Sequence, residues 1–207
     1  MPRGLFLSLD GVDGAGKSTQ CRLLADWLCA QGRQVVVCHD PGGTDVGQQV
    51  RNLLLHYRGA MSMTTEALLF MASRAQLVAE VIRPALENAK VVICDRFLLA
   101  NVVYQGHAGG LDPGQLWNLG LFCTGGLEPD LTVVLDLPPE VAFERRTAST
   151  DRMEARGAEY FAKVRAGYLA EAQRRPDRVR VINAALSPEQ VQKMLREEFA
   201  RAVTKHE

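Results

Sequence analysis

A glycine-rich stretch near the N-terminus, GVDGAGKS at positions 11 to 18, fits the pattern G-x-x-x-x-G-K-[ST]. Glycines at these positions allow tight turns that bring backbone N–H groups together, and such a nest binds phosphate. The lysine can reach the β- and γ-phosphates of a nucleotide, and the serine hydroxyl can bind magnesium. A glycine-rich turn without a ligand is the plainer alternative. An apolar run before the motif and a helical pattern after it favour nucleotide binding, which we expect at Gly11, Val12, Asp13, Gly14, Ala15, Gly16, Lys17, Ser18 and Thr19.

A charge pair, Asp95 and Arg96, directly follows the apolar run Val91 to Cys94. Ligands of parallel sheets bind beyond the carboxyl ends of the strands, so a charge pair at this position is a candidate for binding chemistry. Arginine offers forked donors and a permanent charge, which suit a phosphate. We expect Arg96 to act on phosphate. Asp95 is expected either to orient Arg96 or to help Ser18 hold magnesium, partly through water.

The elements that must position these residues follow from the apolar pattern. Helical patterns run from Lys17 to a terminating Gly32, from Asp45 to Leu55, and from about Thr64 to Asn88, where Pro84 is expected to kink the helix. Uninterrupted apolar runs between helices favour an α/β fold with a parallel sheet covered on both faces. The five expected strands are Leu5–Leu9, Val35–Cys38, Val91–Cys94, Leu131–Leu135 and Val179–Ile182.

Composition limits the classes of partner. The chain has 207 residues, of which 47% are hydrophobic, so we expect a single domain over residues 1–207. Its 24 basic and 24 acidic residues leave no net charge, and we therefore expect neither nucleic acid nor a membrane as a partner. The five cysteines form no C-x-x-C pair, which is typical of reduced thiols in a cytoplasmic protein. The N-terminal apolar run is too short for a signal peptide.

A series of further motifs carries a more specific resemblance. Together with GVDGAGKST, the chain resembles the thymidylate kinase family of P-loop nucleoside monophosphate kinases in DPGGT (40–44), LFMASRAQ (69–76), DRF (95–97), YQG (104–106), DRME (151–154) and VRAGYL (164–169). The resemblance implies a P-loop kinase fold with a short lid at about 145–155. It also implies ATP-dependent, magnesium-assisted phosphorylation of dTMP to dTDP for dTTP biosynthesis, in a homodimer. The alternatives are another acceptor, such as dUMP, and a regulatory module that binds nucleotide without turnover.

The resemblance also implies roles for individual acceptor-site residues. Phe70 would stack on the thymine ring, and Arg74 would hold the base edge or the acceptor phosphate. Asn101 would read the pyrimidine edge, Tyr104 would crowd the 2′ position of the sugar, and Gln105 would add a polar contact. From the residues alone, a core aromatic is the favoured interpretation of Phe70, and a solvated helix residue is the favoured interpretation of Arg74.

The remaining roles concern charge. The resemblance implies that Arg51 contacts the monophosphate, that Asp13 faces the acceptor or its magnesium, and that Asp40, where Glu is commoner, lines the acceptor site. Catalysis is expected from Lys17, Arg96, Asp95 and Asp13. No general base is needed, because a phosphate monoester is already anionic at neutral pH. Relatives place an arginine at position 14 or in the lid; here position 14 is glycine, which leaves the lid arginines Arg145, Arg146 and Arg152.

Overall fold

The computed structural model describes residues 4–145, 152–153 and 156–204. Within them, a parallel sheet has the strand order β2-β3-β1-β4-β5. The predicted α/β class and the five predicted strands are confirmed. Each strand ends one residue later than predicted, and in every case this last residue is polar. The strands are β1 (Leu5–Asp10), β2 (Val35–His39), β3 (Val91–Asp95), β4 (Leu131–Asp136) and β5 (Val179–Asn183).

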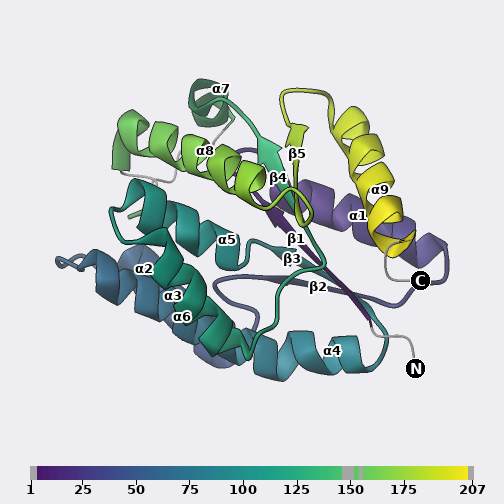
Figure 1. The fold of residues 1–207 in the computed structure, drawn as a ribbon, viewed down its shortest axis with the longest axis horizontal. Helices are drawn as coiled ribbons and strands as arrows, with labels where there is room; N and C mark the ends of the chain where they lie inside the picture. Colours follow the sequence, from purple (N-terminus) through teal and green to yellow (C-terminus); the bar gives the residue numbers. More distant parts are fainter. Residues whose placement is uncertain (1–3, 146–151, 154–155, 205–207) are drawn as a thin grey trace.

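Helices cover both faces of the sheet. Figure 1 shows α1 and α9 on one side, and α3, α5, α6 and α8 on the other. The helical segments are α1 (Lys17–Ala30), α2 (Asp45–His56), α3 (Met63–Leu77), η1 (Val78–Ile82), α4 (Arg83–Glu87), α5 (Leu98–Asn101), η2 (Val102–Ala108), α6 (Pro113–Thr124), α7 (Pro139–Glu144), α8 (Gly157–Arg174) and α9 (Pro188–Thr204).

Local sequence sets where helices α1 and α2 begin and where α1 ends. Helix α1 begins after Gly16, whose φ of 90° is left-handed and suits glycine. After α1, Gly32 takes a φ of 78°, as expected of the residue that ends a helix. Helix α2 begins after Thr44, whose side chain accepts a hydrogen bond from the Gly47 N–H at 2.9 Å.

The helical stretch predicted from Thr64 to Asn88 consists of three segments. Helix α3 is followed by the π-helical turn η1 and then by α4, which contains Pro84 near its start. Proline has no N–H to donate to the preceding turn, so a regular α-helical ladder cannot continue through it. The wider π spacing lies just ahead of Pro84, and the Arg83 N–H donates to the Val78 carbonyl.

Alternating strand residues pack into two clusters of core side chains. Leu7 and Ile93 pack with Leu24 of α1 and Leu195 of α9. Phe6, Val92 and Cys94 belong to a second cluster with Met71, Ile82 and Leu98. Complete burial of such a side chain contributes about 1.5–3 kcal/mol. A one-residue slip would exchange the two faces of a strand, so this packing fixes the register and with it the positions of Asp95 and Arg96.

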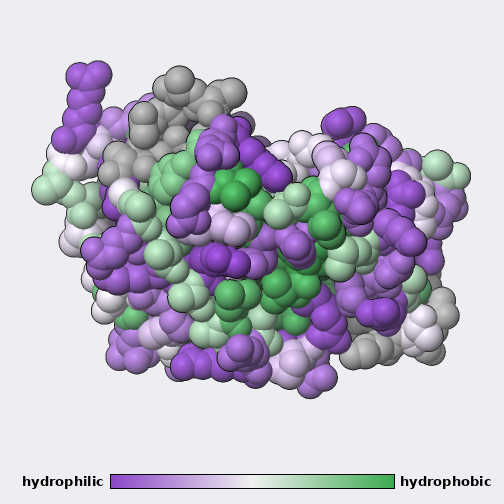
Figure 2. Space-filling view, turned by 90° about the horizontal axis from the view of Figure 1, so that it is seen from above, coloured by the Kyte–Doolittle hydropathy of each residue, from purple (hydrophilic) through white to green (hydrophobic). Residues whose placement is uncertain are grey.

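The outer surface carries both hydrophilic and hydrophobic residues. Figure 2 shows hydrophilic residues over most of one face, with hydrophobic residues gathered toward its middle. Among the described residues, no helix combines the length and hydropathy that a membrane span requires.

Candidate active site

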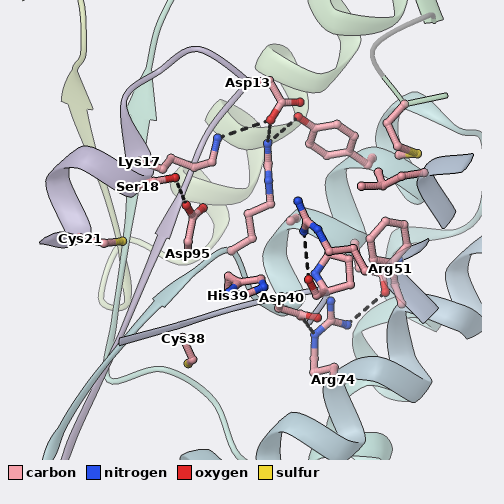
Figure 3. A pocket seen from close by; sticks show the side chains of 18 of the residues that line it. Asp13, Lys17, Ser18, Cys21, Cys38, His39, Asp40, Arg51, Arg74 and Asp95 are labelled. Carbon is pink, nitrogen blue, oxygen red and sulfur yellow. Dashed lines mark hydrogen bonds and ion pairs between the residues drawn. The ribbon is translucent and has the colours of Figure 1, made fainter. Parts of the chain in front are cut away.

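A cleft of about 970 Å³ opens where the strands end at their carboxyl edge. The glycine-rich loop after β1 forms one wall, residues after β2 and β3 form another, and α3 and η2 complete it. The cleft therefore lies at the edge where a parallel sheet binds ligands. Figure 3 shows the charged side chains of these segments pointing toward one another. Most of the predicted site residues line this one cleft: Asp13, Gly14, Gly16, Lys17, Ser18, Thr19, Asp40, Arg51, Phe70, Arg74, Asp95, Arg96, Asn101, Tyr104, Gln105 and Arg145.

The glycine-rich loop has the tight geometry that its composition predicts. Gly11 and Gly14 take φ values of 134° and 87°, which side chains rarely adopt. A Cβ at Gly14 would lie 2.6 Å from the Ala142 carbonyl oxygen. Helix α7 therefore occupies the space that an arginine at position 14 would need. Val12 and Ala15 are buried beneath the loop and support it.

Lys17 is held inside the loop. Its Nζ donates to the Val12 carbonyl oxygen at 2.9 Å and lies 3.8 Å from Asp13 Oδ1. Only 7% of Lys17 is exposed. Burial lowers the pKa of Lys17, and the neighbouring Arg96 lowers it further. A cation in so dry a position gains strongly from an anionic ligand.

Ser18 and Asp95 lie side by side. Ser18 Oγ donates to Asp95 Oδ2 at 2.6 Å, which joins the start of α1 to the end of β3 (Figure 3). A hydroxyl and a carboxylate oxygen are hard ligands, and Mg²⁺ binds one or two such groups together with phosphates and water. Among the described residues there is no cluster of three or more His, Cys, Asp or Glu side chains suited to a metal. A magnesium ion shared with a nucleotide needs no such cluster, and the Ser18–Asp95 pair fits it.

Arg96 turns back over the loop. Its φ of 69° lies in the left-handed region, and its N–H donates to the Leu9 carbonyl at 2.9 Å. Its guanidinium donates to the Gly11 carbonyl at 2.8 Å and to Asp13 Oδ1 at 2.6 Å. It also donates to the hydroxyls of Tyr168 at 3.2 Å and Tyr104 at 3.3 Å. Asp95 and Arg96 thus point to different partners, Ser18 and the loop.

Arg74 is buried at the other end of the cleft. It donates to Asp40 Oδ2 at 2.6 Å, to Asn101 Oδ1 at 3.1 Å, and to the Phe97 carbonyl at 3.3 Å. A fourth bond goes to the Met71 sulfur at 3.1 Å. These bonds to described residues occupy four of the five N–H donors of a guanidinium. The solvated-helix interpretation of Arg74 is therefore wrong.

Only one carboxylate oxygen of Asp40, the partner of Arg74, accepts a hydrogen bond from the described residues. Burial raises the pKa of Asp40, and Arg74 opposes that rise without overcoming it. Its Oδ1 is buried and accepts no hydrogen bond from the described residues. Asp40 lines the cleft, and this unpaired oxygen is buried within the wall of the cleft.

Phe70 and Arg51 flank this region. Phe70 is only partly buried against the core and lines the cleft, so its ring is open to a ligand. Arg51 donates from Nη1 to the Pro41 carbonyl at 3.0 Å, which holds its half-buried head in the cleft (Figure 3). Phe97 packs edge-on against Phe6 with ring centroids 4.9 Å apart and lies beneath the Arg74 guanidinium.

The predicted lid arginines have different positions. Arg145 lines the cleft and donates to the Ala184 carbonyl at 3.0 Å, beyond the end of β5. Arg146 lies outside the described residues. Arg152 does not line the cleft; it donates to Glu66 Oε2 at 2.6 Å and to the Leu54 carbonyl at 2.8 Å.

Several contributors were not predicted. Tyr168, within the VRAGYL motif, bonds to Arg96 and lies 3.4 Å from Asp10 Oδ1. His39 also lines the cleft. Burial is the main cause that lowers the pKa of His39, and the nearby charge of Arg51 lowers it further. Glu66 joins several side chains behind the cleft. Its charge among apolar neighbours in a predicted helix was the one signal in the sequence, because a buried carboxylate needs partners.

Comparisons with known proteins identify the family of this chain. The family model for thymidylate kinase matches residues 9–195. A thymidylate kinase of Symbiobacterium thermophilum is 51% identical over 93% of this chain and 91% of its own length. One of Kosmotoga olearia is 42% identical over 97% and 98%. The crystal structure of thymidylate kinase from Ehrlichia chaffeensis superposes with a TM-score of 0.79, at 30% identity over 96% of this chain and 99% of that one. The chain belongs to the thymidylate kinase family.

Proposed function

We infer that this chain transfers the γ-phosphoryl group of ATP to dTMP, giving dTDP. The observation that carries this assignment is the single cleft in which a phosphate-binding loop, with Lys17 and Arg96, faces an aromatic platform and a buried forked donor, Phe70 and Arg74. Family membership supports the same reaction. The residue roles that follow are proposals.

The main task of the side chains in this reaction is to reduce repulsion between two polyanions. Lys17 and Arg96 supply fixed positive charge at the glycine-rich loop, and both are anchored before any ligand binds. Fixed donors in a dry site stabilise developing charge without reorganisation. Asp13 Oδ1 accepts a hydrogen bond from Arg96 Nη2 at 2.6 Å, which keeps the guanidinium in place. We propose Lys17, Arg96, Asp95 and Asp13 as the catalytic group.

Magnesium would be held by Ser18 and, partly through water, by Asp95. Bound there, the ion would neutralise phosphate charge. Their hydrogen bond keeps the hydroxyl and the carboxylate together, so both oxygens would be directed at one position.

The acceptor would lie between α3 and η2. Phe70 offers its face to the base. Arg74 has one N–H left beyond its four protein bonds, which suits a single carbonyl of the base edge better than the three oxygens of a phosphate. Arg51, with one bond to a backbone carbonyl, keeps a more open fork for the monophosphate. Asn101, Tyr104, Gln105 and Asp40 complete this half of the cleft.

The donor base would lie on the opposite side of the loop. The acceptor residues follow β2 and β3, whereas Arg145 and Ala184 follow β4 and β5. We therefore propose Arg145 as the arginine beside ATP. A catalytic role for Arg152 stays a prediction, as do the single domain over residues 1–207 and the lid at about 145–155.

A homodimer would form through α3 and α6. Leu68 of α3 is 50% exposed and Phe122 of α6 is 84% exposed, and the two helices pack together. Exposed apolar side chains on neighbouring helices favour an interface. Sedimentation analysis should give a dimer, and Phe122→Asp should give a monomer. A monomeric wild-type protein would contradict this proposal.

Two further expectations stay predictions. One is cytoplasmic residence, which the five free thiols support, and the other is that the chain has no nucleic-acid partner.

The activity is tested by coupled-assay turnover over dTMP, dUMP, dCMP, dGMP and TMP with its ribose sugar. We expect dTMP to give the highest kcat/KM, with dUMP lower by about 1–3 kcal/mol of discrimination, since the two differ by one methyl group. Lys17→Met serves as the control for contaminating kinases and should be inactive. A better acceptor than dTMP, or ATP binding without turnover, would contradict the proposal.

A further inference from the structure

Two buried amides, Asn101 and Gln105, line the acceptor half of the cleft. They are four positions apart, where α5 continues into η2. Asn101 Nδ2 donates to Gln105 Oε1 at 2.6 Å. An amide can turn either its oxygen or its nitrogen toward a neighbour, so its orientation decides whether a ligand meets an acceptor or a donor. The bond between the two amides makes their orientations depend on each other.

Groups at the two ends of this pair fix its direction. Arg74 Nη1 donates to Asn101 Oδ1 at 3.1 Å, and a guanidinium accepts no hydrogen bond. Gln105 Nε2 donates to Glu66 Oε1 at 2.8 Å, and an ionised carboxylate donates none. Reversing both amides would therefore turn N–H against N–H at the Arg74 end and oxygen against oxygen at the Glu66 end. Mismatched contacts of this kind are costly in a buried chain.

The other oxygen of Glu66 is occupied by two arginines. Oε2 accepts from Arg152 Nη2 at 2.6 Å and from Arg156 Nη2. These ion pairs compensate the charge of a carboxylate that is only 1% exposed. Arg152 is itself anchored, because its Nε donates to the Leu54 carbonyl at 2.8 Å. Glu66 therefore meets Gln105 with Oε1, an oxygen that can only accept.

The direction of the chain determines what a base would meet. Arg74 keeps one N–H, on Nη2, beyond its four bonds to described residues. Asn101 Oδ1 lies against the same guanidinium and has a second lone pair. A donor next to an acceptor matches a pyrimidine with a carbonyl at C4 beside a ring N–H, as in thymine and uracil. Cytosine has an amino group at C4 beside a bare ring nitrogen, which is the opposite pattern.

We propose that Glu66 is a positioning residue for acceptor specificity: through Gln105 and Asn101 it directs the acceptor half toward a 4-keto pyrimidine and against a 4-amino one. The proposal rests on the proposed function and names the feature of the base that the site selects. Arg74 opposes reversal of Asn101 at one end of the chain. Glu66 adds a second mismatch at the other end, so both amides would have to turn against fixed partners before cytosine could fit.

Steady-state kcat/KM for dTMP, dUMP and dCMP, measured on the wild-type protein and on Glu66→Gln, tests this role. The amide introduced by Glu66→Gln can donate to a reversed Gln105, which removes the mismatch at that end. We therefore expect the dTMP-to-dCMP ratio of kcat/KM to fall by about tenfold or more. The dTMP-to-dUMP ratio should stay within about twofold of the wild-type value, because both bases carry the same 4-keto edge.

Gln105→Met is the second variant, and it decides the matter if Glu66→Gln folds poorly. It breaks the chain between Glu66 and Asn101, so Asn101 can reverse without meeting a mismatch at the Glu66 end. It should therefore lower the dTMP-to-dCMP ratio as well.

Glu171→Gln is the matched control. Glu171 is an equally buried carboxylate with several donors, His107, Trp117 and Arg174, none of which lines the cleft. Its variant should lose thermal stability and keep both wild-type ratios.

A dTMP-to-dCMP ratio that stays at the wild-type value in Glu66→Gln and Gln105→Met would overturn the proposal. A fall of both ratios by the same factor in Glu66→Gln would also overturn it, since that result indicates a general loosening of the site. A wild-type protein that phosphorylates dCMP as well as dTMP would overturn this proposal and leave the kinase activity toward dTMP standing. Failure of the wild-type protein to phosphorylate dTMP would instead overturn the proposed function, and this proposal with it.

Discussion

Replacing Arg96 by alanine and by glycine separates its proposed role in catalysis from its effect on stability. Both changes remove the guanidinium that bonds to Gly11 and Asp13 over the loop. An arginine that stabilises the transferred phosphoryl group contributes roughly 10³- to 10⁵-fold in rate, which is about 4–7 kcal/mol. We therefore expect both variants to lose about 10³-fold or more in kcat, by nearly the same factor.

The two variants should differ in stability. Position 96 has a φ of 69°, where an alanine costs about 1–2 kcal/mol and a glycine is unstrained. The glycine variant should unfold about 2–4 °C above the alanine variant for each kcal/mol of this difference, given a chain of this length. Differential scanning calorimetry on the two proteins measures this directly.

The assay for catalysis is coupled turnover at saturating ATP and dTMP, with ATP affinity measured separately. Arg96→Lys is the control for charge alone, and it should recover only part of the rate because it lacks the fork. A loss below tenfold in the alanine variant would remove Arg96 from its assigned role. An alanine variant as stable as the glycine variant would refute the inference of backbone strain.

Three further predictions concern single side chains. Ser18→Ala should raise the magnesium concentration needed for half-maximal turnover, whereas Ser18→Thr should not; an unchanged requirement in the alanine variant would contradict the Ser18–Asp95 site. Burial raises the pKa of Asp10 from 3.8 to about 6, so the folded protein binds the proton more tightly than the unfolded chain does. Wild-type stability should therefore fall by about 3 kcal/mol relative to Asp10→Asn as the pH rises from about 3 to about 7, and urea unfolding that shows a constant difference would refute this. Tyr104→Phe removes one 3.3 Å hydrogen bond to Arg96 but keeps the ring, so kcat should fall about tenfold or less while rejection of the ribose sugar stays intact; loss of that rejection in steady-state kinetics would assign it to the hydroxyl.

The sheet could be predicted almost to the residue because its strands are short apolar runs that end at polar side chains. Val91 to Cys94, closed by Asp95, is the clearest example. Helical periodicity predicted the stretch around Pro84 but not the π-helical turn before it, because the pattern of apolar residues hardly changes when the ladder widens by one residue.

The site could be predicted where its chemistry is local in sequence. Ser18 and Lys17 follow from the glycine-rich motif alone. Contacts between distant residues left no such pattern: Tyr168 reaches Arg96 across 72 positions, and Arg152 reaches Glu66 across 86. The left-handed backbone at Arg96 was equally hidden, since arginine has no preference for it.

The hydrogen bonds of Arg74 have a consequence for the design of inhibitors. A carboxylate on a designed acceptor-site compound would gain little by pointing at this guanidinium, because Asp40, Asn101 and the Phe97 carbonyl already hold most of its donors. A neutral carbonyl aimed at its last N–H would need no such displacement. Negative charge on the compound would be better directed toward Arg51. Its guanidinium donates one hydrogen bond, to the Pro41 carbonyl, and its other N–H groups can bind an anion. The proposed acceptor half of the cleft therefore favours a compound that is uncharged near Arg74 and anionic near Arg51.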